Sequence, residues 1–181
     1  MPVIKWYHHG GTCGTPPTVN NHKRAKRGDV GGWSASSTRS NTRFLYSIRE
    51  NDLTGFGFAY TLTVKDCPTS HEDWHKVRRA FFERMRRLGM IRAHWVTEWQ
   101  RRGVPHLHCA IWFESPDVTA EPLVHWWNLT KKFGSGLRGQ HWARINDSVG
   151  WFKYLSKHAS RGLSHYQRSP ENVPEGWKKT G

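Results

Sequence analysis

The alternation of apolar and polar positions along the chain predicts four strands. Residues 56–64 alternate aromatic and β-branched side chains, a pattern typical of a central strand. Residues 91–99 are rich in β-forming residues, and residues 103–113 are almost wholly apolar apart from two histidines, as in a buried strand. A shorter strand is expected over residues 139–146.

Helical periodicity separates and follows these strands. Ser70 and Asp73 form a capping box at the start of a helix whose apolar residues recur every three or four positions until Gly89 ends it. Further helices are expected over residues 34–50, 120–133 and 149–160. The central order of strand, helix, strand, strand, helix, strand is typical of a ferredoxin- or RRM-like α+β domain. We therefore expect an antiparallel sheet with helices on one face and an appended C-terminal helix.

The loop between the second and third strands positions three polar side chains. Its sequence, Arg101-Arg102-Gly103, suits a three-residue hairpin loop with the glycine in the left-handed region, which places Glu98 directly opposite His106. Because strand side chains alternate faces, His106, His108 and Glu98 share one face. Two imidazoles and a carboxylate are suitable ligands for a divalent cation. The alternative is that the histidines are hydrogen-bonded core residues, which is the commoner role of an isolated His-x-His pair.

The last predicted helix carries a candidate nucleophile. Tyr154, Lys157 and His158 lie three or four positions apart and so share a helical face. A lysine ammonium favours the phenolate form of a nearby tyrosine, and a phenolate can attack phosphorus. The alternative is an amphipathic helix whose tyrosine packs half-buried and whose lysines are solvated.

Composition indicates the class of partner. The 181 residues contain 28 Lys and Arg against 14 Asp and Glu, a formal net charge of +14, which favours a polyanion such as nucleic acid. No apolar run approaches the ~20 residues of a membrane-spanning helix and no signal peptide is evident, so we expect a cytoplasmic protein that does not use a membrane. Three cysteines without a C-x-x-C pair predict neither a disulfide framework nor a zinc knuckle.

The chain divides into three regions. Residues 1–50 are expected to form a basic N-terminal arm, irregular over its first 32 residues, followed by a short helix. Residues 51–161 form the predicted domain, and residues 162–181 a tail or linker. His8-His9 in the arm has the appearance of a metal-binding pair, but we interpret it as part of a polar tail.

The ordered motifs resemble those of HUH endonucleases. These enzymes carry two histidines flanking a hydrophobic residue, as in His106-Leu107-His108, an acidic ligand on the neighbouring strand, as Glu98, and a helical Tyr-x-x-Lys, as Tyr154 to Lys157. Tyr60-Thr61-Leu62-Thr63 is similar to the family's first motif, a structural strand. The resemblance covers roughly residues 55–160, and within the superfamily it is to rolling-circle replication initiators of small single-stranded DNA viruses, filamentous phages and plasmids.

This resemblance implies a site-specific single-stranded DNA endonuclease and strand transferase. Glu98, His106 and His108 would hold Mn²⁺ or Mg²⁺, Tyr154 would form a 5′-phosphotyrosine, and Lys157 would assist. The substrate would be single-stranded or hairpin DNA at a replication origin, with a host helicase and a polymerase as partners. Residues 51–161 would then be the endonuclease domain.

Two departures and three alternatives accompany the resemblance. His158 stands where family members with paired tyrosines have the second one, which favours a one-tyrosine mechanism, and no G-x-x-x-x-G-K-[ST] helicase motif occurs. Tyr166 is the next candidate nucleophile.

A transposase or conjugative relaxase would share the chemistry of the HUH initiators. A non-catalytic RRM-like module would share the fold and charge, and a structural zinc site would use the same three ligands but leave a coordination position open.

Overall fold

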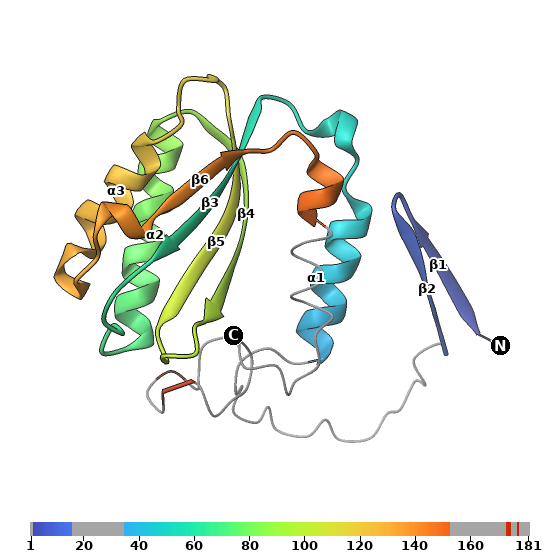
Figure 1. The fold of residues 1–181 in the computed structure, drawn as a ribbon. Helices are drawn as coiled ribbons and strands as arrows, with labels where there is room; N and C mark the ends of the chain where they lie inside the picture. Colours follow the sequence, from blue (N-terminus) through green and yellow to red (C-terminus); the bar gives the residue numbers. More distant parts are fainter. Residues whose placement is uncertain (1, 16–34, 153–172, 175–176, 178–181) are drawn as a thin grey trace.

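The computed structural model describes residues 2–15, 35–152, 173–174 and 177. Its elements are β1 (Val3–Tyr7), β2 (Gly10–Gly14), α1 (Ala35–Ser47), β3 (Phe56–Thr63), α2 (His71–Arg87), β4 (Met90–Trp99), β5 (Pro105–Phe113), α3 (Glu121–Thr130) and β6 (His141–Arg144) (Figure 1). Single 3₁₀ turns occur at Glu50–Asp52, Lys131–Phe133 and Leu137–Gly139. A further helix begins at residue 148 and is described as far as residue 152.

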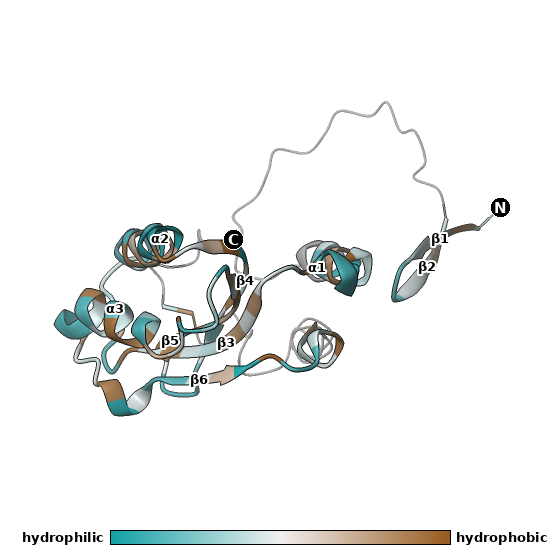
Figure 2. Cartoon of the chain, turned by 90° about the horizontal axis from the view of Figure 1, so that it is seen from above, coloured by the Kyte–Doolittle hydropathy of each residue, from teal (hydrophilic) through white to brown (hydrophobic). Residues whose placement is uncertain are grey.

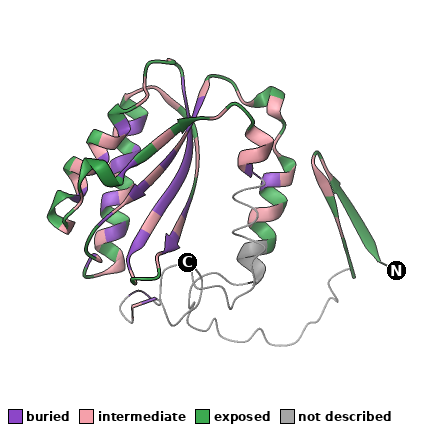
Figure 3. Ribbon diagram, viewed as in Figure 1, coloured by how far each residue is buried: buried purple, intermediate pink, exposed green. Residues whose placement is uncertain are grey.

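The four larger strands form one antiparallel sheet in the order β4-β5-β3-β6. The two central strands are thus the first and third of the four in the chain, which is the arrangement of a ferredoxin-like βαββαβ unit. The predicted α+β fold class and the four predicted strands are confirmed. β5 is buried along nearly its whole length, as its apolar sequence predicts (Figure 3).

The main core lies between the sheet and the helices α2 and α3. Ser70 begins α2 as predicted, its hydroxyl accepting a hydrogen bond from the Asp73 N–H at 3.2 Å. Trp74 of α2 and Trp126 of α3 meet edge to face at 5.4 Å between ring centroids and belong to the same buried core as Leu107 of β5. Apolar burial on this face holds the central strands rigid.

The opposite face of the sheet is covered as well. α1 and the helix that begins at residue 148 lie on this side, across the sheet from α2 and α3 (Figures 1 and 2). Leu45 of α1 and Phe152 pack in one apolar cluster with Val96, Ala110 and Trp112 of β4 and β5. The sheet therefore lies between two helical layers. The expectation of helices on one face holds for α2 and α3 but not for α1 and the helix from residue 148, whose positions the sequence pattern did not predict (Figure 2).

The N-terminal residues contradict the expectation of an irregular arm. β1 and β2 form a hairpin in which Val3 pairs with Gly14 and Tyr7 with Gly10. The run Val3-Ile4-Lys5-Trp6-Tyr7 is rich in β-forming residues, a local signal that the glycines and prolines around it obscured. The basic cluster at residues 23–27 lies outside the described residues.

No helix in the described part of the chain is both long enough and apolar enough to span a bilayer.

Candidate nuclease site

The β4–β5 hairpin has the predicted register. Glu98 is paired with His106, and Val96 with His108. Gly103 adopts φ of 72°, and its N–H donates to the Gln100 carbonyl at 2.9 Å, closing the three-residue loop. The glycine requirement of this loop is the local feature that sets which residues face each other.

The two histidines and the glutamate point to the face covered by α1 and by the helix beginning at residue 148. Leu107 between the histidines belongs to the opposite core, whereas Ala110 and Trp112, which share the histidines' face, pack with Phe152. The Phe152 ring stacks on Trp112 at 6.2 Å between centroids. The helix that begins at residue 148, described as far as Phe152, thus lies on the same side of the sheet as the candidate metal ligands.

The three side chains lie close together in a buried setting. Glu98 is 6% exposed and His108 is 8% exposed, and Oε2 of Glu98 lies 3.4 Å from Nε2 of His108. The rings of His106 and His108 stack with their centroids 4.5 Å apart and an interplanar angle of 17°. A carboxylate this deeply buried requires an imidazole or a cation beside it.

Polar side chains of the neighbouring segments hold the histidine rings. Thr61 Oγ1 lies 3.2 Å from His108 Nδ1, and the Gln100 amide bonds to His106 Nδ1 and, at 3.0 Å, to Thr63 Oγ1. Such contacts to the second ring nitrogen fix the orientation of metal-binding histidines. The sequence analysis missed Thr61, Thr63 and Gln100 as site residues. Because Thr61 pairs with His108 and Thr63 with His106, the β3–β5 register would have identified the two threonines.

The donor set suits a divalent cation. Burial lowers the pKa of His106 to about 4, with His108 and Arg102 also lowering it and Glu98 opposing. The ring is therefore neutral at pH 7, the form that can bind a metal. Its Nε2 is buried and has no hydrogen-bond partner among the described residues. This buried, unsatisfied nitrogen beside a carboxylate and a second imidazole is the observation that favours a metal.

The coordination shell is not assembled in this structure. The ligand atoms of Glu98, His106 and His108 do not all lie within 4.8 Å of one another. With the Gln100 amide donating to His106 Nδ1, the ring proton of the neutral imidazole sits on Nε2. Coordination through Nε2 therefore requires the Gln100 amide to rotate so that its oxygen accepts from Nδ1–H.

The family follows from comparison with known proteins. The family model described as replication-associated protein ORF2/G2P matches residues 57–159, more than half of the chain. The chain belongs to the replication-associated protein ORF2/G2P family. The matched residues, 57–159, include Glu98, His106, His108, Tyr154 and Lys157, so the ORF2/G2P match spans all the predicted site residues.

Three curated relatives are similar over nearly the whole chain. Replication proteins of Xylella fastidiosa strains 9a5c and Temecula1 are 58% and 55% identical over 179 residues, and the replication-associated protein G2P of Pseudomonas phage Pf3 is 52% identical over 187 residues. These alignments cover 98%, 98% and 100% of this chain but 63%, 68% and 67% of the relatives. The chain thus spans about two thirds of their length. No solved structure gives a significant match.

Part of the predicted ORF2/G2P site lies outside the described residues. Tyr154, Lys157 and His158 belong to this part, as does the alternative nucleophile Tyr166. The structure describes the helix up to Phe152, which is 5% exposed. The roles of these four side chains stay predictions.

A partly buried histidine near the site, His94, predicts acid sensitivity. It packs on the same sheet face, where its Nε2 donates to Asn41 Oδ1 of α1 at 3.1 Å and its ring stacks on Phe44. Burial lowers its pKa to about 4, so between pH 6.5 and 4 the unfolded chain binds the proton that the folded chain excludes. Stability is therefore expected to fall as the pH drops through this window.

The variant His94→Gln tests this expectation, because an amide can still donate to Asn41 but does not titrate. Between pH 7 and pH 4.5 the parent is expected to lose about 1–2 kcal/mol more unfolding free energy than the variant. Urea denaturation at the two pH values measures the difference. His75→Gln, on the exposed surface of α2, is the matched control and should behave as the parent. Equal pH dependence in His94→Gln and the parent would contradict the prediction.

Proposed function

We propose that this protein is an HUH-type endonuclease and strand transferase that nicks single-stranded DNA at a replication origin and so initiates rolling-circle replication. The observation that carries the proposal is the β4–β5 register, which pairs Glu98 with His106 and puts His108 on the same buried face. Membership of the ORF2/G2P family supports a replication role, and the names of its relatives agree with it.

The protein's own groups would prepare a metal site at the scissile phosphate. Glu98 supplies a carboxylate oxygen, and His106 and His108 supply ring nitrogens, which suits Mn²⁺ at least as well as Mg²⁺. A bound ion of this kind supplies Lewis-acid polarisation of a phosphate oxygen. Thr61 would orient the His108 ring, Gln100 would orient the His106 ring once its amide oxygen faces Nδ1, and burial keeps His106 neutral.

Tyr154 is the proposed nucleophile. It follows Phe152 by two residues, and Phe152 packs on the sheet face that carries the histidines and Glu98. Its phenolic oxygen would form a bond to phosphorus while the bond from phosphorus to the 3′ oxygen breaks. The tyrosine loses its proton and the leaving oxygen gains one, giving a 5′-phosphotyrosine and a free 3′-OH for a polymerase. Lys157 would stabilise the phenolate and the charge that develops on phosphorus.

The energy of the broken phosphodiester is retained in the tyrosine ester, so the reverse reaction can rejoin ends without ATP. With His158 four residues after Tyr154, we propose that a second cleavage uses another protomer or water. A host helicase would separate the strands. The net charge of +14 supports binding to the DNA backbone.

The covered sheet argues against a non-catalytic RRM-like module. Such a module binds bases on aromatic side chains of an open sheet face. Here α2 and α3 cover one face and α1 with the helix from residue 148 covers the other (Figure 2). Trp112, an aromatic residue of β5 on the second face, is buried and stacks on Phe152.

The direct test is the covalent adduct. Purified protein is incubated with Mn²⁺ and short single-stranded oligonucleotides that tile the origin of the replicon encoding it, and the products are separated on a denaturing gel. We expect a protein band shifted by the mass of the 3′ fragment of the oligonucleotide. When the oligonucleotide is labelled at its 5′ end, the label should stay on the released 5′ fragment, which ends in a free 3′-OH. Peptide mapping of the adduct should identify Tyr154. Cleavage without any adduct would contradict the proposed mechanism.

A further inference from the structure

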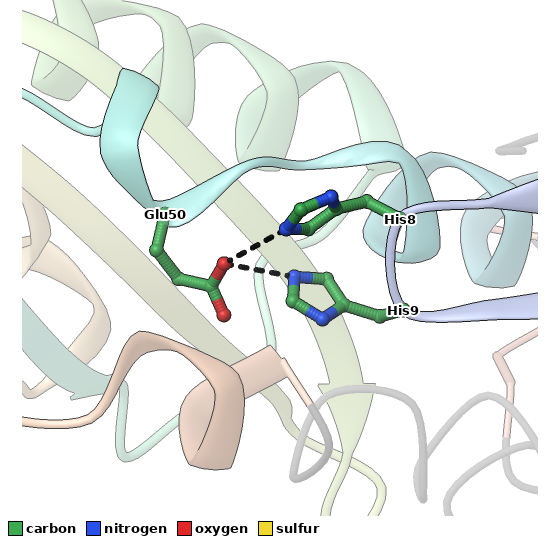
Figure 4. Close-up of side chains that lie close together, drawn as sticks. All are labelled: His8, His9 and Glu50. Atoms are coloured by element: carbon green, nitrogen blue, oxygen red, sulfur yellow. Dashed lines mark ion pairs between the residues drawn. The ribbon is translucent and has the colours of Figure 1, made fainter.

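A second group of metal-ligating side chains lies outside the candidate nuclease site. Nε2 of His8 and Nε2 of His9 both approach Oε2 of Glu50, at 3.5 Å and 3.1 Å (Figure 4). Their ligand atoms all lie within 4.8 Å of one another, which no other group of three in the described part of the chain achieves. The imidazole rings meet edge to face with centroids 4.6 Å apart, so both nitrogens can converge on one point.

Two separate segments of the chain build this group. His8 and His9 form the turn between β1 and β2, and Glu50 begins the 3₁₀ turn after α1. The His9 N–H donates to the Tyr46 carbonyl at 3.0 Å, which anchors the turn to the end of α1. A Cβ added at Gly10 would lie 3.1 Å from the Tyr46 ring, so the turn is also closely packed there. The geometry of the three side chains is thus held by main-chain contacts.

The environment of His9 Nε2 is the second observation that favours an ion at this group. Nε2 is buried from solvent, and although it lies close to Glu50 it makes no hydrogen bond among the described residues. A buried polar nitrogen without a hydrogen bond requires an explanation, and an ion is one of the usual ones. His8 is about half exposed and Glu50 about one third exposed, so an ion can reach them from solvent.

We propose that His8, His9 and Glu50 bind a first-row divalent transition-metal ion, best matched by Zn²⁺, which fastens the β1–β2 hairpin to the segment after α1. Two imidazole nitrogens and one carboxylate oxygen are a zinc ligand set of the open kind, in which water takes the fourth position. Each ligand contributes a lone pair, and any proton on the imidazoles is released to solvent when the ion binds. The inference does not depend on the proposed nuclease function, because none of its residues belongs to that site.

The structure contains a matched control for this site. His125 and Glu121 form a histidine–carboxylate pair on α3, 3.6 Å apart, and among the described residues no second imidazole joins them as a ligand group. Removing this carboxylate tests whether any surface histidine–glutamate pair accounts for metal uptake. Removing Glu50 tests the proposed site itself.

The experiment measures Zn²⁺ binding to the full chain by isothermal titration, without DNA, for the parent, Glu50→Gln, His9→Gln and Glu121→Gln. We expect Glu50→Gln and His9→Gln to lose one equivalent of bound zinc, or to bind it about tenfold or more weakly, while Glu121→Gln matches the parent. Co²⁺ substituted for Zn²⁺ should give visible absorption that disappears in the same two variants. Unfolding midpoints without metal show whether each variant is folded.

Hydrogen exchange tests the structural consequence separately. Zn²⁺ should slow amide exchange across residues 3–14 in the parent and in Glu121→Gln but not in Glu50→Gln. Zinc uptake that is equal in the parent and Glu50→Gln overturns the proposal. So does uptake that leaves exchange in the hairpin unchanged.

Discussion

Tyr154→Phe is expected to abolish adduct formation and nicking of origin single strands, reducing the cleavage rate by about four orders of magnitude or more. The substitution removes one oxygen atom, the one that would form the bond to phosphorus, and retains the aromatic ring. DNA affinity should change by less than about twofold, because backbone binding depends on the distributed positive charge. Single-turnover cleavage with 5′-labelled oligonucleotides, together with a filter-binding or anisotropy titration, measures both quantities.

Tyr166→Phe is the control for this experiment. It should cleave as the parent does and form the same amount of adduct. If Tyr154→Phe retains cleavage while Tyr166→Phe loses it, the nucleophile is Tyr166 and the prediction of Tyr154 is wrong. Retention in both variants would exclude both tyrosines.

His106→Ala is expected to lose metal-dependent cleavage, with a rate at least about 10²-fold below that of the parent at saturating Mn²⁺. The histidine supplies a buried nitrogen on the face that it shares with Glu98 and His108. Cleavage rates across a Mn²⁺ titration in chelator-treated buffer measure the effect. A variant that cuts as well as the parent in metal-free buffer would refute the metal site.

Two further variants separate chemistry from stability at this position. His106→Gln keeps a polar side chain next to Gln100 and should be as inactive as His106→Ala while unfolding closer to the parent's midpoint. His75→Ala, on the exposed surface of α2, removes an imidazole outside the site and should leave cleavage unchanged. Loss of activity in His75→Ala would indicate a general effect of removing histidines.

The two metal proposals can be distinguished from each other. The His8, His9 and Glu50 group is expected to respond to Zn²⁺ without DNA and to change hairpin exchange. The Glu98, His106 and His108 group is expected to control cleavage. Glu50→Gln should therefore leave the chemistry at the scissile phosphate intact, and His106→Ala should leave the hairpin site intact.

Local sequence determined most of the elements and the central register of the site. A hairpin loop is closed by residues that are neighbours in the chain, so the glycine at position 103 was enough to predict that Glu98 faces His106. The Ser70 cap and the helical periodicity after it are local in the same sense. The fold class followed from the order of these elements.

Only the tertiary structure decided how distant segments meet. Thr61 and His108 are 47 positions apart, and their contact depends on the β3–β5 pairing, which no local periodicity encodes. The same holds for α1 covering the site face of the sheet and for the His8-His9 turn reaching Glu50. Hydrophobic patterning states which side of an element is buried but not which element buries it, because apolar contacts are non-directional and partners far apart in the chain are selected by packing.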